Sequence, residues 1–364
     1  MRHALALAFG TALCLAGAAA AEPAKAPAAK AYDPSVSPPG WKAPRTAFGQ
    51  PDLSGYWTNA SLTPITRNTR LTNKSVLTEA EAIAQEKTWA EAVSEANAET
   101  PKDELDKVTT VDKSNERKIV GLRPDFQFAG GDVGGYNTFW LDPGSHIMKV
   151  GGEYRTAIIT TPNGQPPPRK PGAPPAPGFG RDVYDSYETR STGERCITSF
   201  GRNAGPPMLS NGYYNNGYQI VQTPEAVVIH VELIHEIRVV RLNDKHRTDG
   251  LRPAMGDSIG WWDGDTLVVE TTNLPERDNF FGAWKNLKVT ERFTRVSKEQ
   301  VNYKFTVEDP DVWDAPWGGE YNFSPYKGIY EYACHEGNYS LPGILAGARA
   351  AEKASAGGKP GGVH

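Results

Sequence analysis

Polar and apolar residues alternate most clearly between residues 301 and 309. Side chains of alternate residues in a β-strand point to opposite faces. This stretch has an apolar face made of Tyr303, Phe305 and Val307 and a polar face made of Asn302, Lys304, Thr306 and Glu308. The pattern therefore predicts a half-buried strand.

Similar stretches surround this one and predict a sheet that dominates the fold. We expect strands over 154–161, 218–223, 226–233, 237–242, 266–273 and 287–296, with turns at Asp263-Gly264 and at 297–300. Successive long antiparallel strands favour a curled sheet. The fold class is therefore mainly β: an antiparallel, lipocalin-like barrel or a sandwich with a few peripheral helices. A β-propeller is the alternative, although no repeat of blade length is found.

The strand signal between residues 226 and 242 is too long for one uninterrupted strand. Its first part places Val227, Ile229, Val231 and Leu233 on one face and Val228, His230, Glu232 and Ile234 on the other. A bulge or bend near Ile234-His235 is expected, and it would redirect the side chain of His235.

Helices and irregular segments flank the predicted sheet. Thr78 and Glu81 fit a capping box that begins a surface helix over about 79–97. Residues 165–181 are rich in proline and predict a mobile or polyproline-like loop that could cover a cleft. The domain is expected to span 50–350, with a Pro/Ala-rich linker at 22–49, a short helix near 344–354 and a disordered tail at 351–364.

The first 21 residues have the pattern of a cleavable signal peptide. Arg2 and His3 precede an uncharged run, and Ala19-Ala20-Ala21 form a small-residue cleavage site. The run is shorter than the roughly 20 apolar residues of a membrane-spanning helix. Leu13 before Cys14 does not suit lipid attachment. We therefore expect a periplasmic or secreted protein with no membrane anchor after cleavage.

Charge and cysteine content narrow the possible partners. The net charge is −4, and the chain has no block of Lys or Arg that would bind nucleic acid. A small molecule is the expected partner, and the oligomeric state stays open. Cys196 and Cys334 would remain after cleavage, and an oxidising compartment favours a disulfide between them.

The most reactive cluster in the sequence is His230, Glu232 and His235. On one strand face, a carboxylate at 232 could orient the imidazole at 230 for acid–base work, or the two could bind a divalent metal ion with His235. The spacing differs from the helical H-E-x-x-H of zinc proteases. A solvated polar face on a half-buried sheet is the competing interpretation.

The stretch around Cys334 also combines reactive groups. If Cys334 pairs with Cys196, His335 lies beside Glu194-Arg195 and could act as a general base. Locking the C-terminus onto the domain is the alternative. Oxidation makes a thiol nucleophile the weaker interpretation.

Tryptophan and aspartate suggest a place for a ring-bearing ligand. Trp261 and Trp262 could stack on a sugar or phenolic ring while Asp257 binds its hydroxyl groups, and Trp313 and Trp317 repeat this chemistry. Core packing is the competing interpretation for all four indoles. Nucleotide-binding glycine loops, a nucleophile elbow and an EF-hand loop are absent from the sequence.

Seven stretches together resemble a family of secreted bacterial proteins of uncharacterised function. They are PDLSGYW at 51–57, ERCI at 194–197, YNN at 214–216 with IVQTP at 220–224, GDSIGWWDGDTLVVETTN at 256–273, ERFTR at 291–295, VEDP at 307–310 and YEYACHEGNY at 330–339. Ile259 departs from the polar or basic residue expected there. The resemblance implies one compact exported domain.

The leading hypothesis is an enzyme, a lyase or hydrolase, that transfers protons on a small sugar derivative or plant phenolic. It would need no cofactor, or only the metal ion. His230 and Glu232 would be the acid–base pair, assisted by Tyr214 or His335. Arg238 or Arg247 would hold an anionic or hydroxylated group. A non-catalytic binding protein and a structural envelope protein are the alternatives.

Overall fold

The computed structural model describes residues 32–96, 142–176, 184–199, 202–209 and 214–356. By its internal contacts the chain divides into residues 1–32 and residues 33–364, and all the elements of the fold belong to the second unit. The predicted signal peptide lies outside the described residues.

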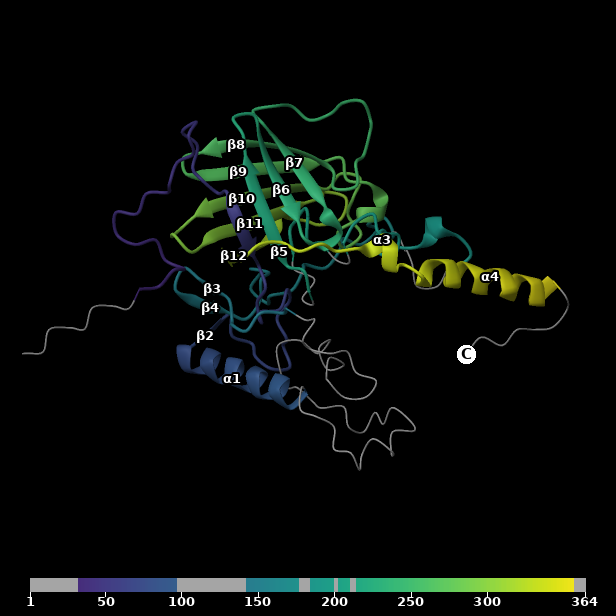
Figure 1. The fold of residues 1–364 in the computed structure, drawn as a ribbon, viewed down its shortest axis with the longest axis horizontal. Helices are drawn as coiled ribbons and strands as arrows, with labels where there is room; N and C mark the ends of the chain where they lie inside the picture. Colours follow the sequence, from purple (N-terminus) through teal and green to yellow (C-terminus); the bar gives the residue numbers. More distant parts are fainter. Residues whose placement is uncertain (1–31, 97–141, 177–183, 200–201, 210–213, 357–364) are drawn as a thin grey trace, which may run out of the picture. The chain divides into compact units, whose positions relative to one another are not determined.

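Nine strands close into a barrel, which confirms the predicted barrel and excludes the sandwich and the propeller (Figure 1). Around the barrel the order is β1, β12, β11, β10, β9, β8, β7, β6 and β5, and β5 pairs with β1. The strands are β1 Gly55–Thr58, β5 Gly217–Gln222, β6 Ala226–Val231, β7 Ile237–Leu242, β8 Asp257–Asp263, β9 Thr266–Thr272, β10 Lys288–Arg295, β11 Val301–Glu308 and β12 Trp317–Pro325.

One pair of strands differs from the expected antiparallel arrangement. β7 and β8 are parallel, with Arg241 opposite Ile259. A two-residue hairpin cannot join parallel neighbours, because the chain must first return to the end where it started. Residues 243–256 make this return. The barrel is therefore mixed, and the expectation of a wholly antiparallel sheet was wrong at this pair.

The expected bend near Ile234-His235 is a complete reversal of the chain. β6 and β7 are antiparallel neighbours joined by a short 3-10 turn, η5 Leu233–His235. Ile234 and His235 have φ values of 60° and 53°. Two successive left-handed residues turn the backbone too sharply for a bulge in a continuous strand. A hairpin, not a bulge, separates the two strands.

Aromatic side chains and a loop fill the inside of the barrel. The fully buried rings are Tyr218, Phe293, Tyr303, Phe305, Tyr321 and Phe323. The loop, residues 202–209, is closed by an antiparallel β-bridge between the backbones of Arg202 and Leu209. Its Met208 has no exposed surface. We call it the inserted loop. The middle of the barrel is thus packed, unlike the open cup of a ligand-carrying lipocalin.

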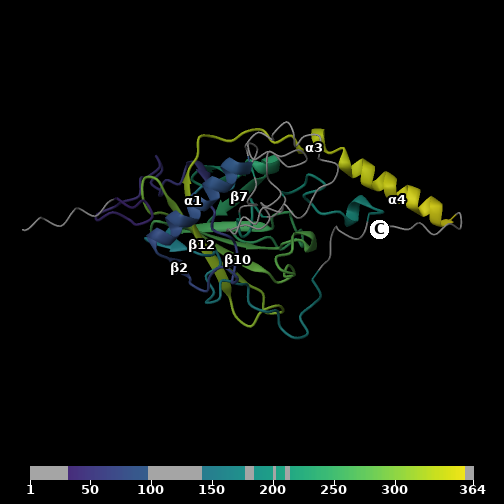
Figure 2. The ribbon, with the colours of Figure 1, turned by 90° about the horizontal axis from the view of Figure 1, so that it is seen from below.

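A second, smaller sheet contains β2 Val76–Leu77, β4 Glu153–Arg155 and β3 Lys149–Val150, in that order. Helix α1 Glu79–Ala96 lies beside β2 in both views (Figures 1 and 2). Its capping box is as predicted: the Glu81 carboxylate accepts from the amide of Thr78 at 2.8 Å. The helix is not purely superficial, because its Ala82 and Trp89 form a separate small core with Leu62, Leu77 and Ile147.

The predicted linker and tail are partly ordered. The indole of Trp41 donates to the carbonyl of Arg295 at 3.0 Å. The backbones of Arg45 and Pro51 form an isolated antiparallel β-bridge. Residues 33–49 are therefore part of the folded unit. After the short helix α3 Cys334–Gly337, helix α4 Ser340–Ala356 extends past the expected end at 354 into the predicted disordered tail. The Pro-rich loop is held at Lys170, whose amide donates to Val312 at 2.8 Å.

Candidate functional site

His230, Glu232 and His235 do not share one strand face. His230 points to the outside of β6 and is half-buried, whereas β6 ends at Val231 and Glu232 has helical dihedral angles. Burial and the nearby His235 lower the pKa of His230. His235 is exposed, and its Nε2 accepts from the amide of Tyr332 at 3.3 Å. Glu232 therefore lies in the turn and not on the strand face that carries His230.

Glu232 holds neighbouring segments together. Its carboxylate accepts from the side chain of Asn215 at 3.0 Å and from the amides of Gly217 at 3.1 Å and Tyr330 at 3.2 Å. Burial raises its pKa, although these hydrogen bonds oppose the shift. Both oxygens are occupied, so Glu232 has the surroundings of a structural carboxylate.

No group of three or more His, Cys, Asp or Glu side chains within the described ranges is arranged to hold a metal ion. The predicted ligands His230, Glu232 and His235 do not form such a group either. Metal ligands must converge within about 2–2.2 Å of one ion. The positions of these three residues give the metal hypothesis no support.

The predicted disulfide is confirmed. Cys196 and Cys334 are bonded, with their Cα atoms 5.8 Å apart. The chain from β12 to Cys334, residues 326–333, thereby crosses to the segment around Cys196 (Figure 1). We call residues 326–333 the C-terminal strap. His335 follows it and is exposed, while the side chain of Asn338 donates to the carbonyl of Glu194 at 2.7 Å.

Tyr214 belongs to the same contact region. Its ring stacks on Tyr332 of the strap at a centroid distance of 6.1 Å. Burial and the neighbouring Tyr332 raise the pKa of Tyr214 to about 12. Tyr214 and His335 therefore both lie near the attachment of the strap.

Arg238 lies inside the barrel and does not face a ligand site. It forms a bidentate ion pair with Glu291, in which Nη1 donates to Oε1 at 3.0 Å and Nη2 donates to Oε2. Its Nε donates to Ser258 at 3.1 Å and Nη2 donates to Thr271 at 2.9 Å. The Tyr303 hydroxyl donates to Glu291 at 2.7 Å. All of these groups are buried, so the proposed substrate role of Arg238 has no geometric support.

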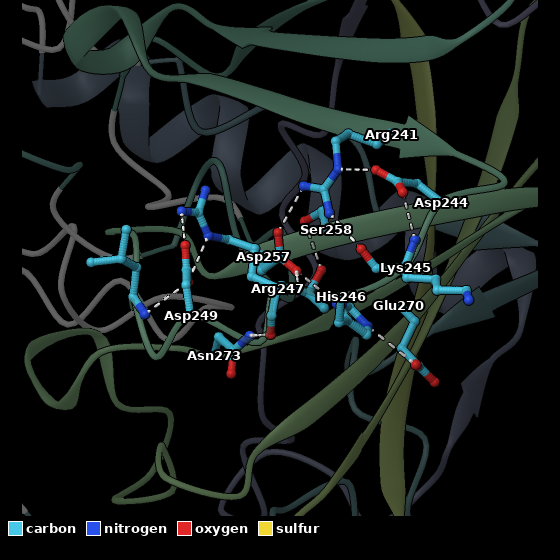
Figure 3. Close-up of polar contacts among 12 residues, drawn as sticks. Arg241, Asp244, Lys245, His246, Arg247, Asp249, Asp257, Ser258, Glu270 and Asn273 are labelled. Atoms are coloured by element: carbon cyan, nitrogen blue, oxygen red, sulfur yellow. Dashed lines mark hydrogen bonds and ion pairs between the residues drawn. The ribbon is translucent and has the colours of Figure 1, made fainter.

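Asp257 and Arg247 lie in a cluster at the crossover between β7 and β8 (Figure 3). The buried Asp257 carboxylate accepts from Arg241 at 2.8 Å and from the amide of Arg247 at 2.8 Å, and it lies 2.9 Å from Nδ1 of His246. Burial raises its pKa, but these partners outweigh it and lower the pKa to about 2. Nε2 of His246 is 3.3 Å from Glu270. The cluster anchors the crossover, and no ring nitrogen of His246 is left for a substrate.

The four tryptophans do not form a common binding platform. Trp261 is 38% exposed on the outside of β8, whereas Trp262 faces the core, because adjacent residues of a strand point to opposite sides. Trp313 and Trp317 are buried and contact each other edge to face at 5.3 Å. Phe280 stacks on Trp317 at 5.7 Å. Core packing thus accounts for Trp262, Trp313 and Trp317.

A polar pocket opens where β7 and β8 begin and β9 ends, and we call it the end pocket. It is lined by Thr198, Ser199, Arg202, Ala204, Gly205, Glu236, Ala254, Met255 and Asp278. Glu236 precedes β7 directly, Ala254 and Met255 precede β8, and Asp278 lies in the loop after β9. The inserted loop supplies one wall, and the segment that follows Cys196 supplies another.

Glu236 is the most perturbed acid in this pocket. Its side chain is 6% exposed, and Oε1 accepts from the amide of Ser199 at 2.8 Å. The Ser199 hydroxyl and the Ala204 amide also lie near the carboxylate and lower its pKa. No described group has hydrogen-bonding geometry to Oε2. Burial, reinforced by the nearby Asp278, raises the pKa of Glu236 to about 7. At neutral pH this carboxyl group can both donate and accept a proton.

Arg202 and Asp278 complete the charged part of the pocket. The guanidinium of Arg202 donates to the carbonyls of Asp278 at 2.9 Å, Asn279 at 3.4 Å and Pro206. It lies 5.0 Å from the centre of the Phe280 ring. Burial raises the pKa of Asp278, although the charge of Arg202 opposes this. The pocket therefore combines two carboxyl groups with raised pKa values and one half-buried cation.

The sequence prediction missed Glu236, Asp278 and Arg202. One signal was present: Glu236 and Arg238 have the same parity as Val240 and Leu242, which are buried. Charged residues in a core-facing register are costly and often functional. The signal was weak because Ile237 and Val239, on the opposite face, are apolar as well as exposed.

Comparison of the chain with protein-family models, curated proteins and solved structures finds no match. The resemblance to secreted bacterial proteins stays a prediction from its seven stretches. Within the described ranges, no helix is long and apolar enough to span a membrane.

Proposed function

We propose that this protein is an acid–base enzyme, a lyase or hydrolase, that uses Glu236 to transfer a proton in the end pocket. One observation carries the proposal. Glu236 is almost completely buried among pocket residues, one of its oxygens has no donor among the described residues, and its pKa is raised to about 7. General acids and bases work best when their pKa lies near the working pH.

The other charged groups of the pocket have complementary roles. Arg202 would stabilise negative charge that develops on a substrate oxygen, as a buried cation does most effectively away from water. Asp278 would be a second carboxyl group that keeps the pKa of Glu236 high. The role predicted for His230 and Glu232 thus passes to Glu236, since both oxygens of Glu232 are occupied by hydrogen bonds.

The lining of the pocket supports a substrate class. Hydroxyl groups of Thr198 and Ser199 and the small apolar surfaces of Ala204 and Ala254 suit a small hydroxylated molecule. We propose a ring-bearing compound such as a sugar derivative or a plant phenolic. The pocket itself is small, so only the reacting group would enter it.

We also propose that the protein acts in the periplasm or outside the cell. The signal-peptide pattern at residues 1–21 and the Cys196–Cys334 disulfide support this location. Disulfides persist in oxidising compartments and are rare in the bacterial cytoplasm.

The enzyme proposal can be tested with a panel of glycosides and phenolic esters, with substrate loss followed by NMR. Glu236→Gln should lower turnover about 100-fold to 10,000-fold, the usual contribution of a general acid or base. Glu232→Gln is the matched control, because it alters a buried glutamate outside the pocket. Equal turnover by the parent and a folded Glu236→Gln protein would refute the assignment. Ligand binding without turnover would instead support the binding-protein alternative.

A further inference from the structure

Arg202 is a half-buried cation without an ion pair among the described residues. All three of its hydrogen-bond acceptors are main-chain carbonyls, and no carboxylate of the described residues lies within ion-pair distance. Its Nε is buried and has no acceptor there. Burial lowers its pKa to about 10. Asp278 and Glu291 oppose this shift from a distance, but neither forms an ion pair with Arg202. Desolvation of a charge is normally offset by an opposite charge in direct contact.

Asp278 lies near Arg202 but does not form an ion pair with it. Arg202 contacts its main-chain carbonyl, whereas its side-chain carboxyl accepts from the hydroxyl of Thr192 at 3.3 Å. Glu236 lines the same pocket and is likewise not paired with Arg202, and its Oε2 has no donor among the described residues. An acceptor for the cation and a partner for the carboxyl group are therefore both missing from the described walls of the pocket.

We propose that the end pocket binds the carboxylate group of an anionic substrate, with Arg202 as the cation and the protonated carboxyl group of Glu236 as a hydrogen-bond donor. The inference rests on the proposed function, because it names the substrate class of the same pocket. Arginine is well suited to this role, since its planar guanidinium matches the geometry of a carboxylate.

Binding in this form requires a proton on Glu236. A substrate carboxylate beside an ionised Glu236 would place two like charges together, which raises the pKa of one of them. The other titratable groups beside Glu236 are Asp278 and, from β5, the hydroxyl of Tyr218. Arg202 lines the same pocket. The Arg238–Glu291 pair lies deeper and is neutral as a unit.

The direction of the pH dependence follows from the raised pKa of Glu236, about 7. Glu236 is mostly protonated below pH 7 and mostly ionised above it. Anion affinity should therefore be full at low pH and fall as the pH rises through 7. From pH 6 to pH 8 the protonated fraction falls about 10-fold, and so should the affinity.

Acetate is the test probe, with neutral acetamide as its matched control. Calorimetric or NMR titrations at pH 6 and pH 8 should show about 10-fold weaker acetate binding by the parent protein at pH 8. Glu236→Gln, which imitates the protonated form, should bind acetate equally at both pH values. Arg202→Gln should lose at least about 10-fold in acetate affinity, the usual order for a charged hydrogen bond, and bind acetamide as the parent does. Arg202→Lys retains the charge and should bind acetate better than Arg202→Gln.

Three results would overturn the inference: acetamide bound as tightly as acetate, acetate affinity unchanged in Arg202→Gln, or parental acetate affinity equal at pH 6 and pH 8. If Arg202→Gln fails to fold, the behaviour of Glu236→Gln decides. The two proposals can fail separately. Acetate binding that follows the expected pattern in a Glu236→Gln protein with full turnover would refute the catalytic role and leave the carboxylate site intact.

Discussion

Glutamate and arginine occur together in two regions of the barrel, and the two regions are built differently. In the middle, Glu291 receives two hydrogen bonds from Arg238 and one from Tyr303, and Ser258 and Thr271 accept from the same guanidinium. Every charged group there has its partners. Such a complete network fixes the positions of β7, β8, β9, β10 and β11 relative to one another.

At the end of the barrel, the same two residue types are left incomplete. Glu236 has one oxygen without a donor among the described residues, and Arg202 donates only to main-chain carbonyls. Partly satisfied buried polar groups reduce stability. Their retention is easier to explain when a ligand completes them. Burial of charge by itself therefore does not mark a functional site. At the end of the barrel two incompletely bonded charged groups line one pocket, and this combination favours a ligand.

Breaking the complete network should have the largest effect on stability. Arg238→Leu leaves Glu291 buried without its cation, and loss of one partner of a buried pair costs about 3–5 kcal/mol. Urea unfolding at pH 7 measures this loss. Arg292→Ala is the control, because Arg292 is 42% exposed and pairs with the exposed Asp263. That pair should contribute less than about 1 kcal/mol. Equal losses in the two variants would show that the central network does not stabilise the barrel.

Removal of the disulfide should cause the second-largest loss of stability, and this loss should be localised at the end of the barrel. Cys196→Ser with Cys334→Ser opens a link between residues 138 apart in sequence, which should lower the free energy of unfolding by about 2–4 kcal/mol. The segment after Cys196 carries Ser199, whose amide bonds Glu236. Hydrogen exchange should therefore increase at Ser199 but not at the central strand β10. Uniform exchange changes in both regions would contradict this division.

The unpaired Glu236 should make stability depend on pH. Its folded pKa of about 7 lies above the ordinary value of 4.5, so the folded state binds more protons between these values. The contribution of Glu236 to stability is therefore full below pH 4.5 and is lost as the pH rises to 7, by about 3 kcal/mol at 1.36 kcal/mol per pKa unit. Urea unfolding between pH 4.5 and pH 8 should show this fall in the parent relative to Glu236→Gln. Parallel pH profiles of the two proteins would place the pKa of Glu236 near its ordinary value.

The regular strands were predictable because their alternation is local. The expected strands at 218–223, 266–273 and 301–309 match β5, β9 and β11 to within one residue. In contrast, β8 was interpreted as a ligand-binding stretch, and of β12 only Trp317 was assigned a role. The alternation of polar and apolar residues is obscured by Trp261-Trp262 in β8 and by Gly318-Gly319 in β12. Gly319 faces the ring of Phe305, where any side chain would collide.

The candidate site was not predictable in the same way. Glu236, Arg202 and Asp278 come from three segments that are 34 or more residues apart in sequence, and their meeting depends on how the inserted loop enters the barrel. The cluster His230, Glu232 and His235 was attractive because it is local. The left-handed residues Ile234 and His235 disperse it, and φ values of this kind have no sequence signal in a β-branched residue such as Ile234.

A third buried glutamate, Glu232, offers a smaller test of the same comparison, since its carboxylate is as fully bonded as that of Glu291. A Cβ atom added at Gly217 would collide with Oε2 of Glu232 and would lie 2.7 Å from Cε1 of Tyr326. Gly217→Ala should therefore lower the free energy of unfolding by about 1–3 kcal/mol, as overpacking does. Gly347→Ala in α4, where a Cβ meets nothing within 4 Å, should stabilise the protein slightly or leave it unchanged.

The location of the loss matters as much as its size. Because Glu232 holds Gly217 and the C-terminal strap through Tyr330, Gly217→Ala should loosen the strap and raise hydrogen exchange at the Tyr330 amide. The end pocket does not include Gly217 or Glu232, so acetate binding at pH 6 should stay at the parental level. The opposite result would be a Gly217→Ala protein in which the Tyr330 amide stays protected but acetate no longer binds. It would contradict both the structural role of Glu232 and the binding role of Glu236.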